Sequence, residues 1–198
     1  KTVDMGRIFY LMGKSATGKD TVYKELLHVK PELKTVVPYT TRPIRAGEEN
    51  GVEYFFVGRP ELESMKAAGK VIELRTYQTV MGPWSYFTMD DGQFDIHGEG
   101  DCLMIGTLES YEKMVEYFGS EAMVPLYIEV PDGIRLRRAV DREEKQQKPN
   151  FREVCRRYLA DEDDFSEEKL SRLGIQKRFL NLELETCLRE LLLEIERR

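Results

Sequence analysis

The sequence predicts an α/β fold in which a parallel sheet carries helices on both faces. Three apolar runs, residues 8–12, 102–107 and 124–130, have the length and composition of buried strands. Each run leads into a stretch with helical spacing, and strands that alternate with helices in this way form a parallel sheet. At 198 residues the chain is expected to form a single domain, with one core and small inserted lobes.

The composition narrows the class of protein. Hydrophobic residues make up 41% of the chain and charged residues 33%, and no run approaches the roughly 18 apolar residues of a membrane-spanning helix. The net charge of −6 argues against a general nucleic-acid binder. Cys102, Cys155 and Cys187 are far apart and form no CxxC pair, which favours reduced thiols in a cytoplasmic protein. The sequence leaves the oligomeric state open.

A glycine-bounded loop follows the first predicted strand. Gly13 and Gly18 allow the backbone to wrap around one anion, and the helix that follows adds free N–H groups and the positive end of its dipole. Lys19 supplies a mobile positive charge for the terminal phosphates of a nucleotide. Strand, loop and helix together predict a P-loop NTPase-type sheet that binds ATP. The predicted nucleotide-binding residues are Gly13, Lys14, Ser15, Ala16, Thr17, Gly18, Lys19, Asp20 and Thr21.

A second candidate phosphate site lies in residues 38–57, PYTTRPIRAGEENGVEYFFV. Arg42 and Arg45 stand three residues apart in a Thr-rich turn, and an aromatic strand begins at Tyr54. Guanidinium groups match phosphate oxygens bidentately, so the pair and the tyrosine hydroxyl could hold a monophosphate. Taken alone, the segment favours a solvated basic loop.

The P-loop followed by TTR-x-x-R-x-GE-x-x-G-x-x-Y-x-F resembles the guanylate kinase family. The resemblance implies that Arg42, Arg45 and Tyr54 bind the phosphate of the acceptor nucleotide. It also implies that Glu73, in a predicted strand at residues 70–74, accepts hydrogen bonds from guanine N1 and N2. Beyond this point the resemblance is weaker.

Several positions depart from the family pattern. Pro38 replaces a serine that contacts guanine, and Met81-Gly82-Pro83 replaces Tyr-Gly-Ser or Tyr-Gly-Thr. The strand at residues 102–107 ends in Ile105 and Thr107 where the family has D-x-D. Residues 84–101 are longer than their counterpart, and we expect an extra hairpin over the acceptor pocket or simple packing of the small lobe.

Two arginine-bearing helices flank a polar tip, EEKQQKPN, after the strand at residues 124–130. The first begins at Pro131-Asp132 and carries arginines on one helical face. The pair resembles the LID that closes over ATP in nucleoside monophosphate kinases. The best matches to LID arginines are Arg138, Arg142 and Arg157, which with Lys19 are the predicted catalytic residues.

Shorter segments complete the predicted fold. A strand is expected at residues 35–37, helices at 60–68 and 109–118, a last strand at 179–181 and a closing helix at 184–195. The predicted division of the single domain is a core of residues 1–37, 102–141 and 157–198, an acceptor-binding lobe of residues 38–101 and a LID of residues 142–156.

The expected metal is Mg²⁺, and two departures bear on its ligands. The P-loop pattern places Ser or Thr after the lysine, where this chain has Asp20. The family places a carboxylate at the end of the following core strand, where this chain has Thr107. The two positions therefore look exchanged, and the hypothesis is that Asp20 and Thr107 together hold Mg²⁺ through hard oxygen atoms.

Three functions are compatible with these residues. The first is ATP-dependent phosphorylation of a nucleoside monophosphate, GMP by resemblance. The second is a kinase of another phosphorylated acceptor, because ribose 1,5-bisphosphate kinases also resemble this pattern and carry Asp after the P-loop lysine. The third is a non-catalytic binding module, which the retained Gly13, Gly18 and Lys19 disfavour.

Overall fold

The core of the protein is a five-stranded parallel sheet. The structure is a computed structural model that describes residues 6–79, 81–94 and 100–197. The strand order is β2-β7-β1-β8-β9, and each neighbouring pair is parallel. The strands are β1 (Ile8–Met12), β2 (Lys34–Thr35), β7 (Cys102–Ile105), β8 (Met123–Glu129) and β9 (Phe179–Leu180). This confirms the predicted α/β class and its first strand.

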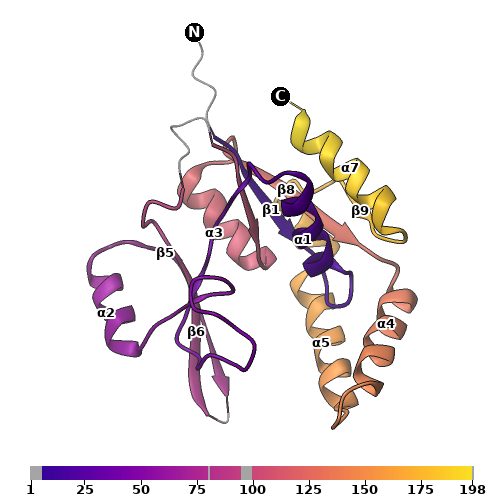
Figure 1. The fold of residues 1–198 in the computed structure, drawn as a ribbon, viewed down its shortest axis with the longest axis horizontal. Helices are drawn as coiled ribbons and strands as arrows, with labels where there is room; N and C mark the ends of the chain where they lie inside the picture. The colour runs from indigo at the N-terminus through magenta and orange to yellow at the C-terminus, as the bar shows by residue number, and fades with distance from the viewer. Residues whose placement is uncertain (1–5, 80, 95–99, 198) are drawn as a thin grey trace.

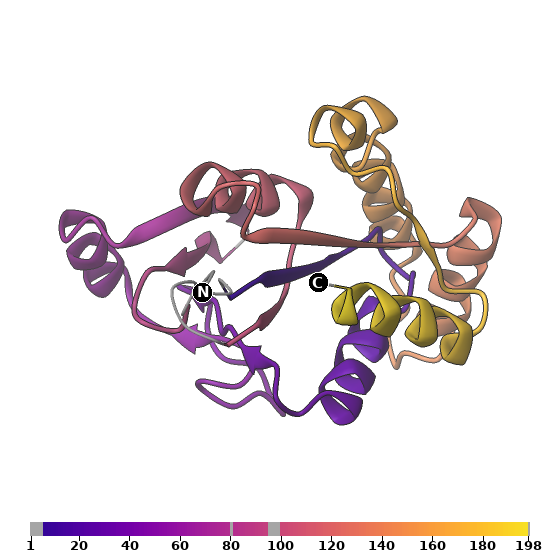
Figure 2. The same ribbon diagram turned by 90° about the horizontal axis from the view of Figure 1, so that it is seen from above.

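Helices cover both faces of this sheet (Figures 1 and 2). Side chains of β1 alternate between the faces, as the period of a strand requires: Tyr10 and Met12 join one apolar cluster and Phe9 and Leu11 the other. The helices α1 (Lys19–Val29) and α7 (Leu184–Glu196) pack on the Phe9 side. The helices α3 (Leu108–Phe118) and α6 (Glu167–Arg172) pack on the Tyr10 side.

A second, four-stranded sheet forms the acceptor lobe, which we define as residues 38–94 of the described chain. Its order is β4-β3-β6-β5. Its elements are β3 (Tyr39–Thr40), β4 (Phe55–Phe56), α2 (Arg59–Ala67), β5 (Val71–Thr79) and β6 (Gly82–Met89). Phe87 and Met89 of β6 pack with Leu62 of α2 in a small core of their own.

The expectation of a separate hairpin in residues 84–101 is wrong for its first part. Residues 84–89 belong to β6, which pairs antiparallel with β5 along its whole length. The predicted strand at residues 70–74 therefore continues to Thr79, and the long hairpin is built from β5 and β6. Residues 95–99 lie outside the described part of the chain.

Two helices project from the core as an arm, here called the LID arm. They are α4 (Asp132–Glu144) and α5 (Phe151–Asp164), and residues 145–150 join them. Figure 1 shows them side by side, extending away from the sheet. Among the described residues, no helix is long and apolar enough to cross a membrane.

Candidate functional site

The loop after β1 is built to close around an anion. A Cβ on Gly13 would lie 2.6 Å from the Ile128 carbonyl oxygen, so a side chain does not fit there. Gly18 has a φ of +81°, which glycine adopts without strain, and its side-chain position is filled by Asn181. The Asn181 amide donates a 2.7 Å hydrogen bond to the Thr17 carbonyl and holds the loop.

The helix that follows presents its free N-terminus to this loop. Helix α1 begins at Lys19, directly after Gly18, and no side chain caps it. Its first N–H groups are therefore available to an anion, which the helix dipole also favours. Lys19 is partly buried at this end, whereas Asp20 and Thr21 are exposed. The predicted nucleotide-binding residues thus lie together on the loop and the first turn of α1.

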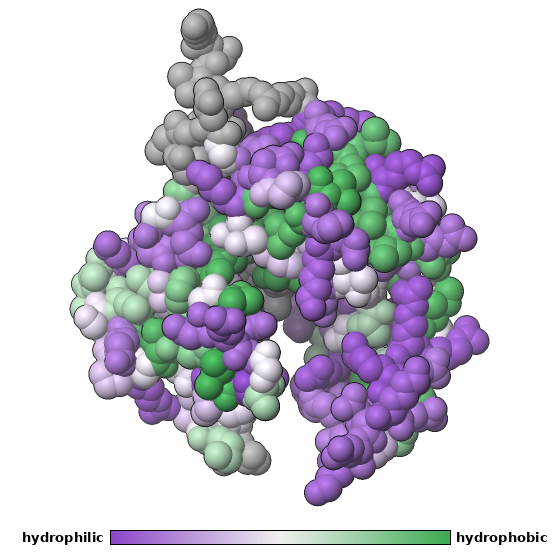
Figure 3. All heavy atoms as spheres, viewed as in Figure 1, coloured by the Kyte–Doolittle hydropathy of each residue, from purple (hydrophilic) through white to green (hydrophobic). Residues whose placement is uncertain are grey.

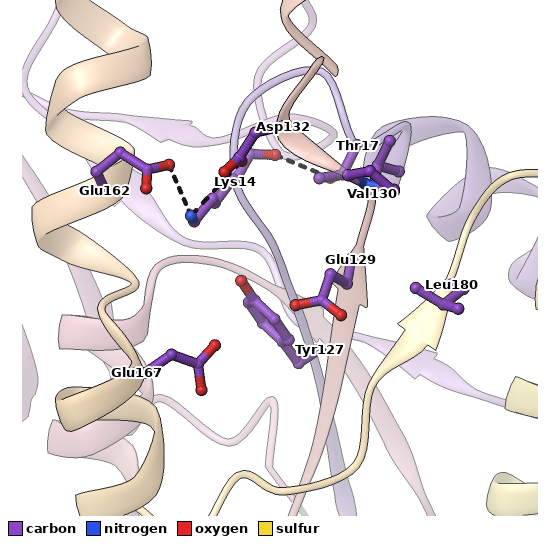
Figure 4. A pocket seen from close by; sticks show the side chains of 10 residues that line it. Lys14, Thr17, Tyr127, Glu129, Val130, Asp132, Glu162, Glu167 and Leu180 are labelled. Atoms are coloured by element: carbon purple, nitrogen blue, oxygen red, sulfur yellow. Dashed lines mark hydrogen bonds and ion pairs between the residues drawn. The ribbon is translucent and has the colours of Figure 1, made fainter. Parts of the chain in front are cut away.

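Carboxylates of α5 also contact this loop, which the sequence did not predict. The Ser15 N–H donates to Asp161 over 2.8 Å, and the Lys14 ammonium lies 2.7 Å from Glu162. Figure 4 shows Lys14 directed toward Glu162 and Asp132. Lys14 therefore has carboxylate partners in this structure.

Arg135 is the centre of the same network. It is 1% exposed, donates to Asp132, Asp161 and Glu162, and lies over the Tyr158 ring at 4.1 Å. The helical spacing of the sequence places Arg135 on one face of this helix together with Arg138 and Arg142. Its burial depends on carboxylates that follow it by 26 and 27 residues, for which the sequence gives no local signal.

The three predicted LID arginines lie in two places. Arg138 donates to the Asn181 carbonyl over 3.1 Å, which brings it next to the residue that holds the phosphate loop. Arg142 and Arg157 line a cavity between α4 and α5 that also includes Ser15. Arg157 is exposed and paired with Glu153 at 2.9 Å.

In the acceptor lobe, Arg42 and Tyr54 come together around a carboxylate. Arg42 is 4% exposed and donates to both oxygens of Glu48, at 2.8 and 2.5 Å. Its guanidinium lies 5.3 Å from the Tyr54 ring centre. Hydrogen bonding by Arg42 lowers the pKa of Glu48 to about 2, so this carboxylate stays ionised. Arg45 is exposed, and its backbone N–H donates to Glu48 over 2.8 Å.

Glu48 is a site residue that the sequence reasoning did not single out. It stands in the R-x-GE part of the motif, and the signal was its fixed distance from the two arginines. Burial raises the pKa of Tyr54, which therefore keeps its hydroxyl proton and can donate it.

Glu73 lies in a chain of buried polar side chains. Its carboxylate accepts a 2.8 Å hydrogen bond from the Thr88 hydroxyl and a 3.0 Å hydrogen bond from Arg75 Nε. Arg75 Nη1 donates in turn to the Thr107 hydroxyl over 2.9 Å. That hydroxyl also accepts from the Ser110 N–H and so caps α3.

An open space separates the acceptor lobe from the LID arm. Figure 3 shows a notch between the acceptor lobe on the left and the strongly hydrophilic LID arm on the right. Two sites suited to anions thus lie on different parts of the molecule.

Comparison with known proteins agrees with this geometry. Residues 5–84 match the guanylate kinase family model. A guanylate kinase from Koribacter versatilis is 44% identical over 68 residues, which cover 34% of this chain and 29% of that protein. One from Neisseria gonorrhoeae is 41% identical over 87 residues, which cover 44% and 40%. The crystal structure of guanylate kinase from Anaplasma phagocytophilum matches 97% of this chain and 85% of its own, with a TM-score of 0.66 and 20% identity. Residues 5–84 are thus similar in sequence to guanylate kinases, and the chain as a whole is similar to one in fold.

The family match defines which parts of the site have sequence support. The matched relatives are covered over less than half of their length, and the family model ends at Trp84. The phosphate loop, Arg42, Arg45, Tyr54 and Glu73 lie inside the matched part. The LID arm lies outside it, where the likeness to guanylate kinases is one of fold.

The contacts of Thr107 speak against the hypothesis that it binds Mg²⁺. Its hydroxyl already accepts from two donors, and one of them is the Arg75 guanidinium. A cation at hydrogen-bond distance would repel a divalent metal on the same oxygen. Thr107 is linked through Arg75 to Glu73, the residue that the family resemblance assigns to binding of the base. The role of Asp20 stays a prediction.

Proposed function

We propose that this protein is an ATP-dependent nucleoside monophosphate kinase that converts GMP to GDP. The observation that carries the proposal is a pair of candidate anion sites, one on the core and one in the acceptor lobe. One is the phosphate loop with the free N-terminus of α1, and the other is the Arg42–Tyr54 cluster. Transfer between two phosphates requires such a pair of sites.

The phosphate loop would hold the β- and γ-phosphates of ATP. Its backbone N–H groups and the first N–H groups of α1 bind the oxygens, and Lys19 adds a positive charge that follows the transferring group. These donors are fixed before ATP arrives, because Gly13 and Gly18 are packed against Ile128 and Asn181. Little reorganisation is then needed during the reaction.

The acceptor phosphate would lie against Arg42, Arg45 and Tyr54. Glu48 holds Arg42 by two hydrogen bonds, so the guanidinium is oriented although part of its donor capacity is used. Arg45 is exposed and can swing onto the phosphate. The Tyr54 hydroxyl adds a neutral donor. Together they screen the negative charge that would otherwise keep the two nucleotides apart.

The LID arm would close over the reacting phosphates. Arg142 and Arg157 face one cavity with Ser15 of the phosphate loop, so a small closure brings their charges to the γ-phosphate. Arginines delivered in this way can raise turnover by about 10³-fold or more. Closure also keeps water from acting as the acceptor.

The residues present fit one bound Mg²⁺. Among the described residues, no group of three or more His, Cys, Asp or Glu could hold a metal. Mg²⁺ is commonly held by one or two carboxylates and completed by phosphate oxygens and water, and the exposed Asp20 at the start of α1 suits this. When bound, Mg²⁺ would screen the charge between the β- and γ-phosphates.

A coupled assay of ADP release tests the proposal. Rates are measured with GMP, dGMP, AMP, CMP, UMP and ribose 1,5-bisphosphate as acceptors, with Lys19→Met as the inactive control. We expect release with GMP and its loss in the variant. A protein that is inert with GMP and active with ribose 1,5-bisphosphate would be a kinase of that other acceptor. Asp20, which follows the P-loop lysine, is the residue that resembles such kinases. If none of these acceptors leads to release of ADP, the non-catalytic binding module is favoured.

A further inference from the structure

A line of polar side chains crosses the acceptor lobe and ends at the core. Its order is Thr88, Glu73, Arg75 and Thr107, and each neighbouring pair is joined by a hydrogen bond of 2.8 to 3.0 Å. The Glu73 side chain is 1% exposed and that of Arg75 14%. Both charges are thus held in place before any ligand binds.

Aromatic side chains connect this line of residues to the candidate phosphate site at Arg42 and Tyr54. Arg75 lies directly opposite Tyr86 in the β5–β6 pair, so both side chains project from the same face. The Tyr86 ring is 5.7 Å from that of Tyr54, which lies beside Arg42. A nucleotide whose phosphate sits at Arg42 can therefore extend its base toward Glu73 and Arg75.

Most of the hydrogen-bonding capacity of Glu73 is already used. Its Oε1 accepts from Thr88 and, at 3.4 Å, from Arg75 Nη2, and its Oε2 accepts from Arg75 Nε. A carboxylate oxygen has two lone pairs, so a single acceptor position remains, on Oε2. Oε1, on the Thr88 side, is filled.

Donors remain at the other end of the line. Nη1 and Nη2 of Arg75 each carry a second N–H that the bonds above leave unused. The Thr107 hydroxyl accepts two hydrogen bonds and keeps its own proton to donate. Along the line, a ligand thus meets one acceptor followed by several donors.

We propose that Glu73, Arg75 and Thr107 read the N1–H, O6 and N7 edge of a 6-oxopurine and are indifferent to a 2-amino group. The edge presents a donor, an acceptor and an acceptor, in the order that the line requires. Adenine presents an acceptor, a donor and an acceptor, which does not match. The 2-amino group of guanine would face the filled Oε1. This inference rests on the proposed function and specifies the base of the acceptor nucleotide. The site binds IMP as readily as GMP.

Arg75 is the specificity-determining residue in this proposal. A pocket that paired two carboxylates with guanine would reward both the N1–H and the 2-amino group. Here the single carboxylate is neutralised by a guanidinium, which binds a carbonyl oxygen instead. Hypoxanthine has that carbonyl and lacks the amino group, so it loses nothing.

The test compares GMP, IMP and AMP in two measurements on the full chain. Calorimetry without ATP gives the Kd of each monophosphate, and the coupled assay gives kcat/KM. We expect GMP and IMP to agree within about threefold in both, and AMP to be weaker by about 100-fold, the discrimination that unpaired polar groups can produce. The wild-type protein suffices for this comparison.

Two variants test Arg75 itself. Arg75→Met removes the donors to O6 and N7, so GMP and IMP should weaken together by about tenfold or more while AMP changes little. Arg75→Lys keeps a positive charge beside Glu73, so it controls for misfolding caused by an unpaired carboxylate. It should also weaken the binding of GMP and IMP, because an ammonium group lacks the planar fork of a guanidinium. The matched control is Arg59→Met, an exposed arginine of α2 in the same lobe.

The outcomes separate this inference from the kinase proposal. Equal binding of GMP and IMP without phosphate transfer would support the proposed base recognition and contradict the proposed kinase activity. Phosphorylation of GMP with IMP weaker by about 30-fold or more would overturn the base reading and keep the kinase. An Arg75→Met protein that is folded and binds both nucleotides like wild type also overturns it, and binding of neither by wild type overturns both.

Discussion

The backbone N–H of Ser15 donates a 2.8 Å hydrogen bond to the carboxylate of Asp161. Ser15 belongs to the phosphate loop and Asp161 to the base of α5, so the loop and the LID arm are joined directly. Asp161 also accepts from the buried Arg135 at 3.3 Å. A movement of the LID arm would therefore displace the phosphate loop or break this hydrogen bond.

The first prediction concerns this joint. Asp161→Ala leaves the Ser15 N–H and part of the Arg135 charge without a partner, which should lower the free energy of unfolding by about 1–3 kcal/mol. The KM for ATP should rise, because the loop loses a contact that fixes it. Urea unfolding and initial rates measure the two effects. Asp164→Ala, an exposed change on the same helix, is the control, and equal stability of the two variants would show that the joint is not stabilising.

The second prediction concerns the carboxylate that orients Arg42. Glu48→Gln retains the shape of the side chain and loses its charge, so Arg42 should be held less firmly. The KM for the acceptor should rise by about tenfold, whereas the KM for ATP should change little. A variant in which the KM for ATP rises and that for the acceptor stays constant would contradict the placement of the acceptor site.

A third prediction follows from the low pKa of Glu48. Arg42 lowers this pKa from 4.5 to about 2 in the folded protein. The ionised carboxylate thus favours the folded state above pH 4.5, and that contribution is lost as the pH falls from 4.5 toward 2. Wild type should be more stable than Glu48→Gln at pH 7, and the difference should shrink between pH 4.5 and pH 2. Glu121→Gln, at an exposed position, serves as the control in urea unfolding.

The fourth prediction concerns the metal. Asp20→Ser should raise the Mg²⁺ concentration that gives half-maximal rate by about tenfold, because a neutral hydroxyl binds the cation less strongly than a carboxylate. A titration of Mg²⁺ at saturating ATP measures this. Glu25→Gln, one turn further along α1, is the comparison. An unchanged Mg²⁺ dependence would remove Asp20 from the metal site.

The fifth prediction concerns packing next to Thr107. A Cβ on Gly106 would clash with the hydroxyl of Tyr10, whose side chain is fully buried. Gly106→Ala should therefore destabilise the protein by about 1–3 kcal/mol, because neither group has room to move. Gly133→Ala, in α4 with its nearest neighbour at 3.6 Å, should be neutral or stabilising. Similar stabilities for both variants would contradict this.

Apolar periodicity was sufficient to predict the core. The apolar run from Ile8 to Met12 is buried throughout, as a central strand requires. The apolar residues of α7 recur at helical spacing because they pack against one face of the same sheet. The length of β5 was not predictable, since Arg75 to Thr79 are mostly polar or exposed and their order comes from pairing with β6.

The charged parts of the site were predictable by type and not by partner. The family resemblance pointed to Arg42 and Glu73, yet their hydrogen bonds to Glu48 and Arg75 depend on turns and strand faces. Arg135 looked like any exposed helical arginine, and its burial results from carboxylates on another helix. Thr107 was assigned to the metal because the family has a carboxylate at this position, whereas its hydroxyl accepts from Arg75 of the acceptor lobe and from Ser110 of α3.

The Asn181 amide that closes the phosphate loop has a consequence for synthesis. It bonds to Thr17 across 164 residues of sequence, so the loop is completed by a residue that is synthesised much later. A chain emerging from the ribosome makes its N-terminal part first and must wait for this contact. Until Asn181 has emerged, α1 lacks the support that shapes its N-terminus for an anion, and a nascent chain should bind nucleotide only after Asn181 has left the ribosome.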